Sequence, residues 1–350
     1  MGPKTLLPSG KRYASLIQQI PPEQTCVEIH PGIYRIRLPL PGKKPGPVNT
    51  YLFIDDPITL IDTGVVQTAG FLRQAMATIG IEFRDIRQVV VTHGHIDHYG
   101  AASIIKKESG ALIYASEADR ISIETGNDVS ARTFLRFLKL SSVPVKFWFS
   151  LWMLGLYFRI MAHTCRVDVL LHEGDDVTLG KYRARVTETP GHSKGSVCLW
   201  LQNEKFVFSG DHILSHITPN AFVMLDDTLK IPVRKSQREY YDSLAKIERM
   251  NPAVVFPAHG ESIYDLPGIA KQYRKSFKQR QDLIVQIVTS GRNDIYSIAR
   301  RLFPVIDRKN LILETFLMIS EVFSHLQVLE EEHKVTLEIL SGRIIVSPAP

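Results

Sequence analysis

The sequence predicts a mixed α/β (α+β) fold: two β-sheets between two layers of helices, followed by a small winged-helix-like domain. Short β-rich runs and helical segments alternate in two successive rounds up to about residue 270. Such rounds are typical of an αββα sandwich. After residue 271, three helical segments lead into a β-rich tail. We therefore assign residues 1–270 to the sandwich domain and residues 271–350 to the winged-helix-like domain.

The first round contains short segments rich in β-branched and aromatic residues, which favour strands. Two segments with apolar residues at helical spacing separate them. We expect strands at Ile33–Leu38, Thr50–Ile54, Thr59–Ile61, Val89–Val91 and Leu112–Ala115, and helices at Thr68–Ile79 and Gly100–Glu108.

The second round repeats the pattern after an interruption. We expect strands at Asp176–Leu179, Tyr182–Glu188, Ser196–Leu201, Lys205–Phe208 and Ala253–Phe256, with a helix at Lys235–Met250. The interruption, residues 126–165, is helical in character and contains the apolar run Phe147–Phe158. A membrane span needs about 20 apolar residues, so we interpret this shorter run as a buried or interfacial helix.

The C-terminal region has the order helix, helix, helix, β-hairpin, which is the winged-helix pattern. The expected segments are Lys271–Ser290, Asn293–Leu302, Leu311–Glu330, Lys334–Leu340 and Arg343–Val346. Asn293 and Asp294 are good N-cap residues for the middle helix.

Composition restricts the class of protein. The three cysteines, Cys26, Cys165 and Cys198, lie far apart, which argues against a disulfide framework and fits a reducing cytosol. Residues 1–10 lack the apolar stretch of a secretory signal. We therefore expect a cytoplasmic protein. The formal charge of +6 permits an anionic partner without demonstrating one.

The segment that carries most of the functional information is His93-Gly94-His95-Ile96-Asp97-His98. It places four potential metal ligands in six residues, directly after an apolar strand and before a helix. A tight turn at a strand's carboxyl end can aim several side chains at one point. Imidazole and carboxylate ligands suit zinc, iron or manganese. The segment therefore predicts a metal site.

Three further donors each follow an expected strand and lie beside a glycine, which lets the backbone turn sharply. They are His192 in Pro190-Gly191-His192, Asp211 in Ser209-Gly210-Asp211, and His259 in Ala258-His259-Gly260. One such donor would be a weak signal, but three in this order strengthen the prediction of a single centre.

This set of motifs resembles the metallo-β-lactamase superfamily over about residues 27–262, through its HxHxDH motif. The resemblance implies a dinuclear site. His93, His95 and His192 would hold one metal, Asp97, His98 and His259 the other, and Asp211 would bridge both. Asp62, in Ile61-Asp62-Thr63-Gly64, matches an early aspartate that orients the metal-binding loop.

The implied chemistry is hydrolysis by a hydroxide that two divalent metals share, with zinc expected and iron or manganese also suitable. Asp97 and Asp211 are the candidate catalytic residues, since Asp97 can hold a proton and pass it to the leaving group. Superfamily members that hydrolyse β-lactams usually have cysteine in place of Asp211. The stretch Pro190–Ser196 instead resembles the PGHxxGS motif of glyoxalase II.

These features favour a small acyl substrate: a carboxylic ester, a thioester or a lactone. Trp148, Trp152 and Tyr157 in the apolar insertion are candidates for contacting it. The insertion would be a lid, a homodimer interface or a peripheral membrane contact. The basic C-terminal segment keeps nucleic acid open as a partner, because that domain resembles the tail of lactamase-like endoribonucleases.

Three alternatives remain at this point. The first is a phosphodiesterase or endoribonuclease of the same superfamily. The second is a mononuclear iron dioxygenase of the persulfide type. The third is a non-catalytic, metal-binding regulatory protein that keeps the fold.

Overall fold

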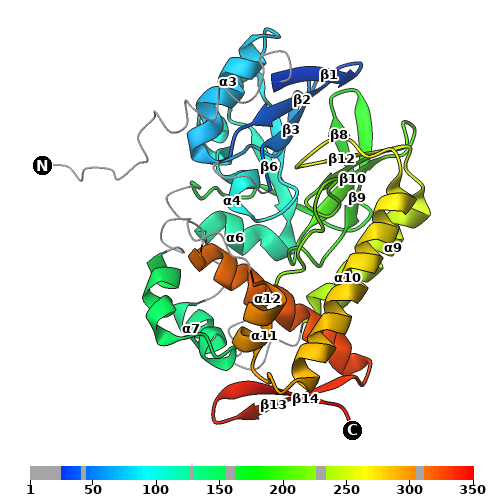
Figure 1. Ribbon diagram of the computed structural model, residues 1–350. Helices are drawn as coiled ribbons and strands as arrows, with labels where there is room; N and C mark the ends of the chain where they lie inside the picture. The colour runs from blue at the N-terminus through cyan, green and yellow to red at the C-terminus, as the bar shows by residue number, and fades with distance from the viewer. Residues whose placement is uncertain (1–24, 41–44, 127–129, 154–161, 226–233, 305–310) are drawn as a thin grey trace, which may run out of the picture.

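The N-terminal strands form the first of the two sheets of the sandwich in the computed structural model (Figure 1). The structure describes residues 25–40, 45–126, 130–153, 162–225, 234–304 and 311–350. Seven strands follow one another in chain order: β1 (Cys26–His30), β2 (Ile33–Leu38), β3 (Val48–Phe53), β4 (Thr59–Ile61), β5 (Gln88–Val90), β6 (Leu112–Ser116) and β7 (Val169–Leu171). Strands β4 to β7 are parallel. Their carboxyl ends therefore meet at one edge of the sheet.

The second sheet has five strands in the order β12-β11-β10-β9-β8. Their bounds are β8 (Asp176–Leu179), β9 (Tyr182–Glu188), β10 (Val197–Leu201), β11 (Phe206–Gly210) and β12 (Val254–Pro257). The two sheets pack face to face through aromatic residues. Tyr51 and Phe53 of β3 lie 4.9 and 5.4 Å from Phe208 of β11, measured between ring centroids. This interface is the central core of the sandwich.

Helices cover the outer face of each sheet. On the first sheet they are α3 (Ala69–Ala77), α4 (Ile96–Tyr99), α5 (Ala102–Ser109) and α6 (Arg120–Thr125), and on the second sheet α9 (Ser236–Met250) and the first half of α10 (Leu266–Thr289). Apolar residues at helical spacing, such as Leu72 and Met76 of α3, face the sheet. The predicted αββα layering is confirmed (Figure 1).

The C-terminal unit contains the second half of α10, then α11 (Ile295–Leu302), α12 (Leu311–Glu331) and a hairpin of β13 (Val335–Leu340) and β14 (Arg343–Pro348). This element order agrees with the sequence analysis. Asp294 caps α11 as expected, since its carboxylate accepts the Ser297 backbone N–H at 2.9 Å. That the unit is a winged helix stays a prediction.

Helix α10 connects the sandwich to the C-terminal unit. It begins at Leu266, and Asp265 caps it by accepting the Gly268 backbone N–H at 2.9 Å. Tyr273 of the first half packs with α9 under the second sheet, whereas Ile284 of the second half packs in the C-terminal core. The boundary expected at residue 271 therefore lies inside a continuous helix that both units share.

Ala162 and Cys165, at the end of the insertion, pack in the core beside the first sheet. The preceding described part, residues 130–153, belongs to the C-terminal core. It contains α7 (Ala131–Leu140), the short helix η4 (Val145–Phe147) and helical residues 148–153. Phe137 of α7 is buried and its ring lies 5.8 Å from that of Phe323 of α12. None of the described helices has the length and apolar character needed to cross a bilayer.

We predict that Phe137→Ala lowers the free energy of unfolding by about 3–5 kcal/mol, because it opens a cavity in this core. Urea denaturation of the full chain measures the change. Phe149→Ala is the matched control in the same segment, because Phe149 is 70% exposed. We expect the control to change stability by less than about 0.5 kcal/mol. Equal small effects would show that the insertion is not part of the core.

Candidate metal centre

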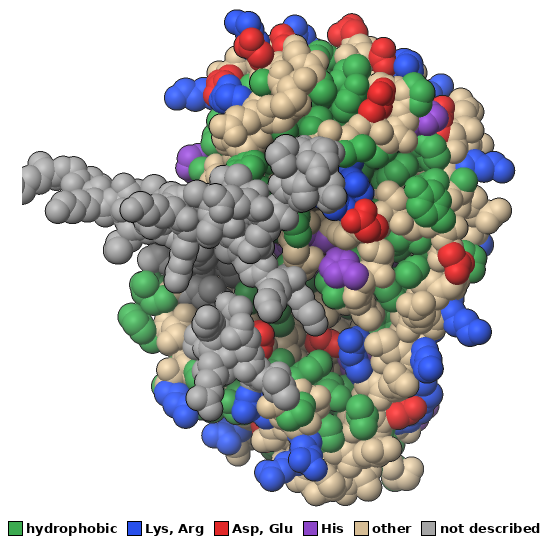
Figure 2. All heavy atoms as spheres, turned by 45° about the horizontal axis from the view of Figure 1, so that its top comes forward, with side chains coloured by type: hydrophobic (Ala, Val, Ile, Leu, Met, Phe, Trp, Pro, Cys, Tyr) green, Lys and Arg blue, Asp and Glu red, His purple; other side chains and the backbone are tan. Residues whose placement is uncertain are grey.

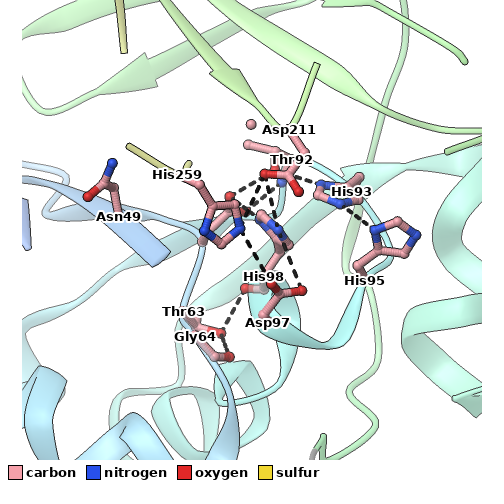
Figure 3. Close-up of polar contacts among 12 residues, drawn as sticks. Asn49, Thr63, Gly64, Thr92, His93, His95, Asp97, His98, Asp211 and His259 are labelled. Atoms are coloured by element: carbon pink, nitrogen blue, oxygen red, sulfur yellow. Dashed lines mark hydrogen bonds and ion pairs between the residues drawn. The ribbon is translucent and has the colours of Figure 1, made fainter. Parts of the chain in front are cut away.

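Seven histidine and aspartate side chains meet where the carboxyl ends of strands from both sheets face each other. Figure 3 labels six of them, from His93 to His98 together with Asp211 and His259. His93 and His95 lie in the turn after β5, as the six-residue motif predicts, whereas Asp97 and His98 lie on the one-turn helix α4 rather than in the turn. The other three residues follow strands of the second sheet: His192 after β9, Asp211 after β11 and His259 after β12. Histidine side chains are visible in a hollow near the centre of the face in Figure 2.

One half of the cluster contains only imidazoles. The Nε2 atom of His93 lies 2.9 Å from Nδ1 of His95, and the same His95 atom lies 3.1 Å from Nε2 of His192. Three nitrogen atoms that converge in this way can bind one cation together. The structure thus brings together the three residues expected for the first metal.

The other half combines carboxylates with imidazoles. Asp97 lies 3.6 Å from His98 and 3.5 Å from His259, measured between carboxylate oxygen and Nε2. Asp211 lies between the halves: its Oδ2 atom is 3.5 Å from His192 Nε2, and its Oδ1 atom is 3.4 Å from His259 Nε2. A carboxylate with one oxygen directed to each side can bridge two cations.

The buried polar atoms of this cluster fit divalent metal ions. His98 Nε2, His259 Nε2 and Asp211 Oδ1 are buried, and each lacks a hydrogen-bond partner among the residues that the structure describes. Buried polar atoms normally have a partner, because an unsatisfied one is costly. All three point toward the same space, and their donor types are those that zinc, iron and manganese bind. A cation in that space would satisfy them.

In three of the histidines, the other ring nitrogen, Nδ1, already has a hydrogen-bond partner. His98 Nδ1 lies 2.8 Å from the carboxylate of Asp62, His192 Nδ1 lies 2.9 Å from the Asn220 carbonyl, and His259 Nδ1 lies 3.0 Å from the Pro47 carbonyl. Such contacts orient the rings and favour the tautomer whose Nε2 lone pair faces the metal. The structure therefore places Asp62 in contact with one of the expected ligands, His98.

The two halves differ in charge. Burial and the neighbouring His95 lower the pKa of His192 to about 4, and burial lowers the pKa of His93 as well. Burial also opposes a charge on His98, but the carboxylates of Asp97 and Asp62 outweigh it and hold the His98 pKa well above its usual range. Without a bound cation, the His93 and His192 imidazoles are therefore neutral, whereas the carboxylates of the other half favour a protonated His98.

Sequence analysis missed Asp119, at the end of the short helix η3 (Glu117–Asp119). Its carboxylate accepts the backbone N–H of Gly94 at 2.8 Å, the backbone N–H of Gly195 at 3.0 Å and the Ser193 hydroxyl at 2.7 Å. It thereby ties the His93–His98 turn to the His192 loop. A Cβ on Gly195 would lie 1.9 Å from Ser116 Oγ, so only glycine fits at this close approach.

A second feature that the sequence did not reveal connects the C-terminal unit to the centre. Ser320 of α12 accepts the Val223 backbone N–H at 2.7 Å, and Ser324 donates to the Ala221 carbonyl at 2.7 Å. The loop that they hold supplies the Asn220 carbonyl to His192. It also places the Phe222 ring 5.3 Å from the rings of both His95 and His192.

Two of the three candidate substrate residues, Trp148 and Trp152, lie in the described part of the insertion, beside the C-terminal core. Trp148 packs partly buried against the C-terminal core and donates its Nε1–H to the Val143 carbonyl at 2.9 Å. Trp152 is 49% exposed beside Phe149. Tyr157 lies outside the described residues. Phe222 is a half-buried aromatic residue that contacts two of the expected metal ligands, His95 and His192.

We predict that replacing both Ser320 and Ser324 with alanine weakens metal binding by about 10–100-fold, the usual effect of removing a contact that orients a ligand. Competition with a chromogenic chelator on the full chain measures the affinity. Ser347→Ala, on the exposed side of β14, is the control and should leave the affinity unchanged. Lower stability with unaltered affinity would mean that the two serines only support packing.

Comparison with known proteins agrees with the geometry. The sequence profile of the metallo-beta-lactamase superfamily matches residues 44–259. The probable metallo-hydrolase YqjP of Bacillus subtilis is 27% identical over 314 residues, which cover 87% of this chain and 94% of that protein. The acyl-coenzyme A thioesterase MBLAC2 of Bos taurus is 28% identical over 160 residues, covering 43% of this chain and 53% of that relative.

Solved structures show the same fold. A metallo-beta-lactamase family protein from Thermus thermophilus superposes with a TM-score of 0.77 at 20% identity, covering 92% of this chain and 100% of the other. A beta-lactamase domain protein from Burkholderia ambifaria gives 0.78 at 21% identity, covering 93% and 94%. With the profile matching more than half of the sequence, this chain belongs to the metallo-beta-lactamase superfamily.

Proposed function

We propose that this metallo-beta-lactamase superfamily hydrolase cleaves an acyl thioester, or a related ester or lactone, with two divalent metal ions. The position of Asp211 carries the proposal. Its two carboxylate oxygens face His192 on one side and His98 and His259 on the other. A single metal would need only one of these groups, whereas a carboxylate shared between them suits a pair.

The donors divide between two metal positions. His93, His95 and His192 would hold one ion, Asp97, His98 and His259 the other, and Asp211 both. Zinc suits this nitrogen and oxygen set best, and iron and manganese also fit it. When bound, such a pair supplies hydroxide at neutral pH and polarises the carbonyl oxygen of the substrate.

Asp97 is placed to handle the proton. It is 20% exposed, whereas the side chains of His98 and His259 are fully buried. His98 and His259 together outweigh burial and keep the pKa of Asp97 below its usual range, so the carboxylate is ionised and can accept a proton at an oxygen. It can then pass this proton to the leaving group.

The surroundings favour an acyl substrate. Phe222 offers a half-buried apolar surface beside His95 and His192, which suits an acyl chain better than a phosphodiester backbone. The relative MBLAC2, named an acyl-coenzyme A thioesterase, supports the same class. Phosphodiester cleavage is the main alternative that the sequence left open, and the assay below distinguishes it from acyl hydrolysis.

We predict that the metal-loaded chain hydrolyses a long-chain acyl thioester, and that Asp97→Asn lowers kcat by about 10²–10⁴-fold because the proton acceptor is lost. Asp211→Ala should abolish turnover. Asp242→Asn, an exposed aspartate on α9, is the matched control. Release of the free thiol, followed with a chromogenic disulfide reagent, measures the rates.

Bis(p-nitrophenyl) phosphate is the comparison substrate in the same assay. Turnover of the phosphodiester alone would overturn the acyl proposal and support phosphodiester cleavage at the same centre. Thioester turnover that survives in Asp211→Ala would show that the reaction takes place elsewhere.

A further inference from the structure

The helical residues 145–153, which comprise η4 and the described residues after it, expose an apolar face. Phe147, Trp148 and Leu151 pack against the C-terminal core. The opposite side presents Val145, Phe149, Trp152 and Met153 with exposed fractions of 71, 70, 49 and 41%. A helix on the surface of a globular protein normally turns polar residues outward. A cluster of exposed large apolar residues instead marks a site of interaction.

Basic residues lie near this apolar face, and the stretch of sequence around it contains no acidic residue. No aspartate or glutamate occurs from residue 129 to residue 167. Arg132, Arg136 and Lys139 are exposed on α7, and Lys146 is exposed next to Val145. Within the described part of the chain, no carboxylate lies within ion-pair distance of these four cations. Their charge is therefore available to an external partner.

The tip of the C-terminal hairpin continues the same surface. Lys139 lies beside Gly342 in the turn between β13 and β14. Ile339 and Leu340 at this tip are 43% and 54% exposed, and Arg343 is exposed as well. Figure 1 shows α7 and the hairpin together at the end of the molecule away from the two sheets. We call these residues of the insertion and the hairpin tip the basic apolar surface.

We propose that the basic apolar surface docks on a bilayer that contains anionic phospholipids. Tryptophan, phenylalanine and aliphatic side chains enter the boundary between headgroups and acyl chains, and lysine and arginine bind the anionic headgroups. Both features occur here on neighbouring elements. The proposed contact is peripheral, with these side chains entering only this boundary.

Other occupants fit less well. A second copy of the chain would bring two sets of unpaired cations together, and like charges repel. A nucleic acid would match the cations and could stack on Phe149 or Trp152. It would leave the aliphatic residues Val145, Met153 and Leu340 without a role. A lipid surface uses all of these groups.

The proposal does not depend on the reaction at the metal centre. Docking would also place an acyl hydrolase next to the phase into which long acyl chains partition. Failure of docking leaves the proposed function intact, and failure of thioester hydrolysis leaves docking intact.

Co-sedimentation of the full chain with vesicles tests the proposal. One set contains phosphatidylcholine with about one third phosphatidylglycerol, and the other phosphatidylcholine alone. We expect binding to the anionic set, weakening steeply with salt because the charges are exposed. Phe149→Glu should lower vesicle affinity at least about tenfold, and Lys139→Glu with Lys146→Glu should lower it similarly.

Matched controls test whether vesicle binding depends on this surface or on exposed charges and aromatic residues anywhere on the chain. Tyr264→Glu changes an aromatic residue that is 76% exposed elsewhere. Lys271→Glu with Lys275→Glu reverses two exposed charges on α10. Both should bind vesicles as the unaltered chain does. Circular dichroism and hydrolysis of a short, water-soluble thioester establish that Phe149→Glu is folded.

Three results would overturn the proposal. One is the absence of binding to anionic vesicles. Another is binding that Phe149→Glu leaves unchanged. The third is a dimer in analytical ultracentrifugation, or a complex with single-stranded RNA, that Phe149→Glu disrupts while vesicle binding stays absent.

Discussion

The hydrogen bonds of the Asp62 carboxylate determine the shape of the candidate metal centre. This buried residue accepts the backbone N–H and the hydroxyl of Thr92 at 2.8 Å each, and bonds His98 Nδ1 at 2.8 Å. It thus fixes the start of the His93–His98 turn and one ligand within it. A buried carboxylate is tolerated only when it is hydrogen-bonded and paired, and the imidazole of His98 supplies the pair. Removal of Asp62 would leave the turn free to move and His98 without its orienting partner.

Around this turn, separate parts of the chain converge. The parallel strands of the first sheet bring Asp62 and His93 to one edge, and three strand ends of the second sheet bring His192, Asp211 and His259 to the same place. Asp119 joins the loops from the two sheets, and α12 supports the loop behind His192. The donors lie on loops, but the rigid elements behind them determine their geometry. The C-terminal unit is therefore structurally part of the centre.

The sequence predicted those strands and ligands that depend on a local pattern of residues. Strands β8 and β9 have the predicted bounds, because alternation of buried and exposed residues is visible over a few positions. The expected ligands were recognisable because four lie within six residues and the others each follow a strand beside a glycine. Asp119 could not be found in this way, because its partners lie 25 to 76 residues away and only the folded chain brings them together. Ser320 and Ser324 resemble ordinary helix residues for the same reason.

The central claim is that one cluster holds two metal ions with Asp211 between them. Anomalous diffraction from crystals of the zinc-loaded chain, collected on either side of the zinc absorption edge, tests it most directly. The account predicts two anomalous peaks about 3.5–4 Å apart. One would contact His93, His95 and His192, and the other Asp97, His98 and His259, with one oxygen of Asp211 near each. A single peak at full occupancy, or two peaks without Asp211 between them, would contradict the account.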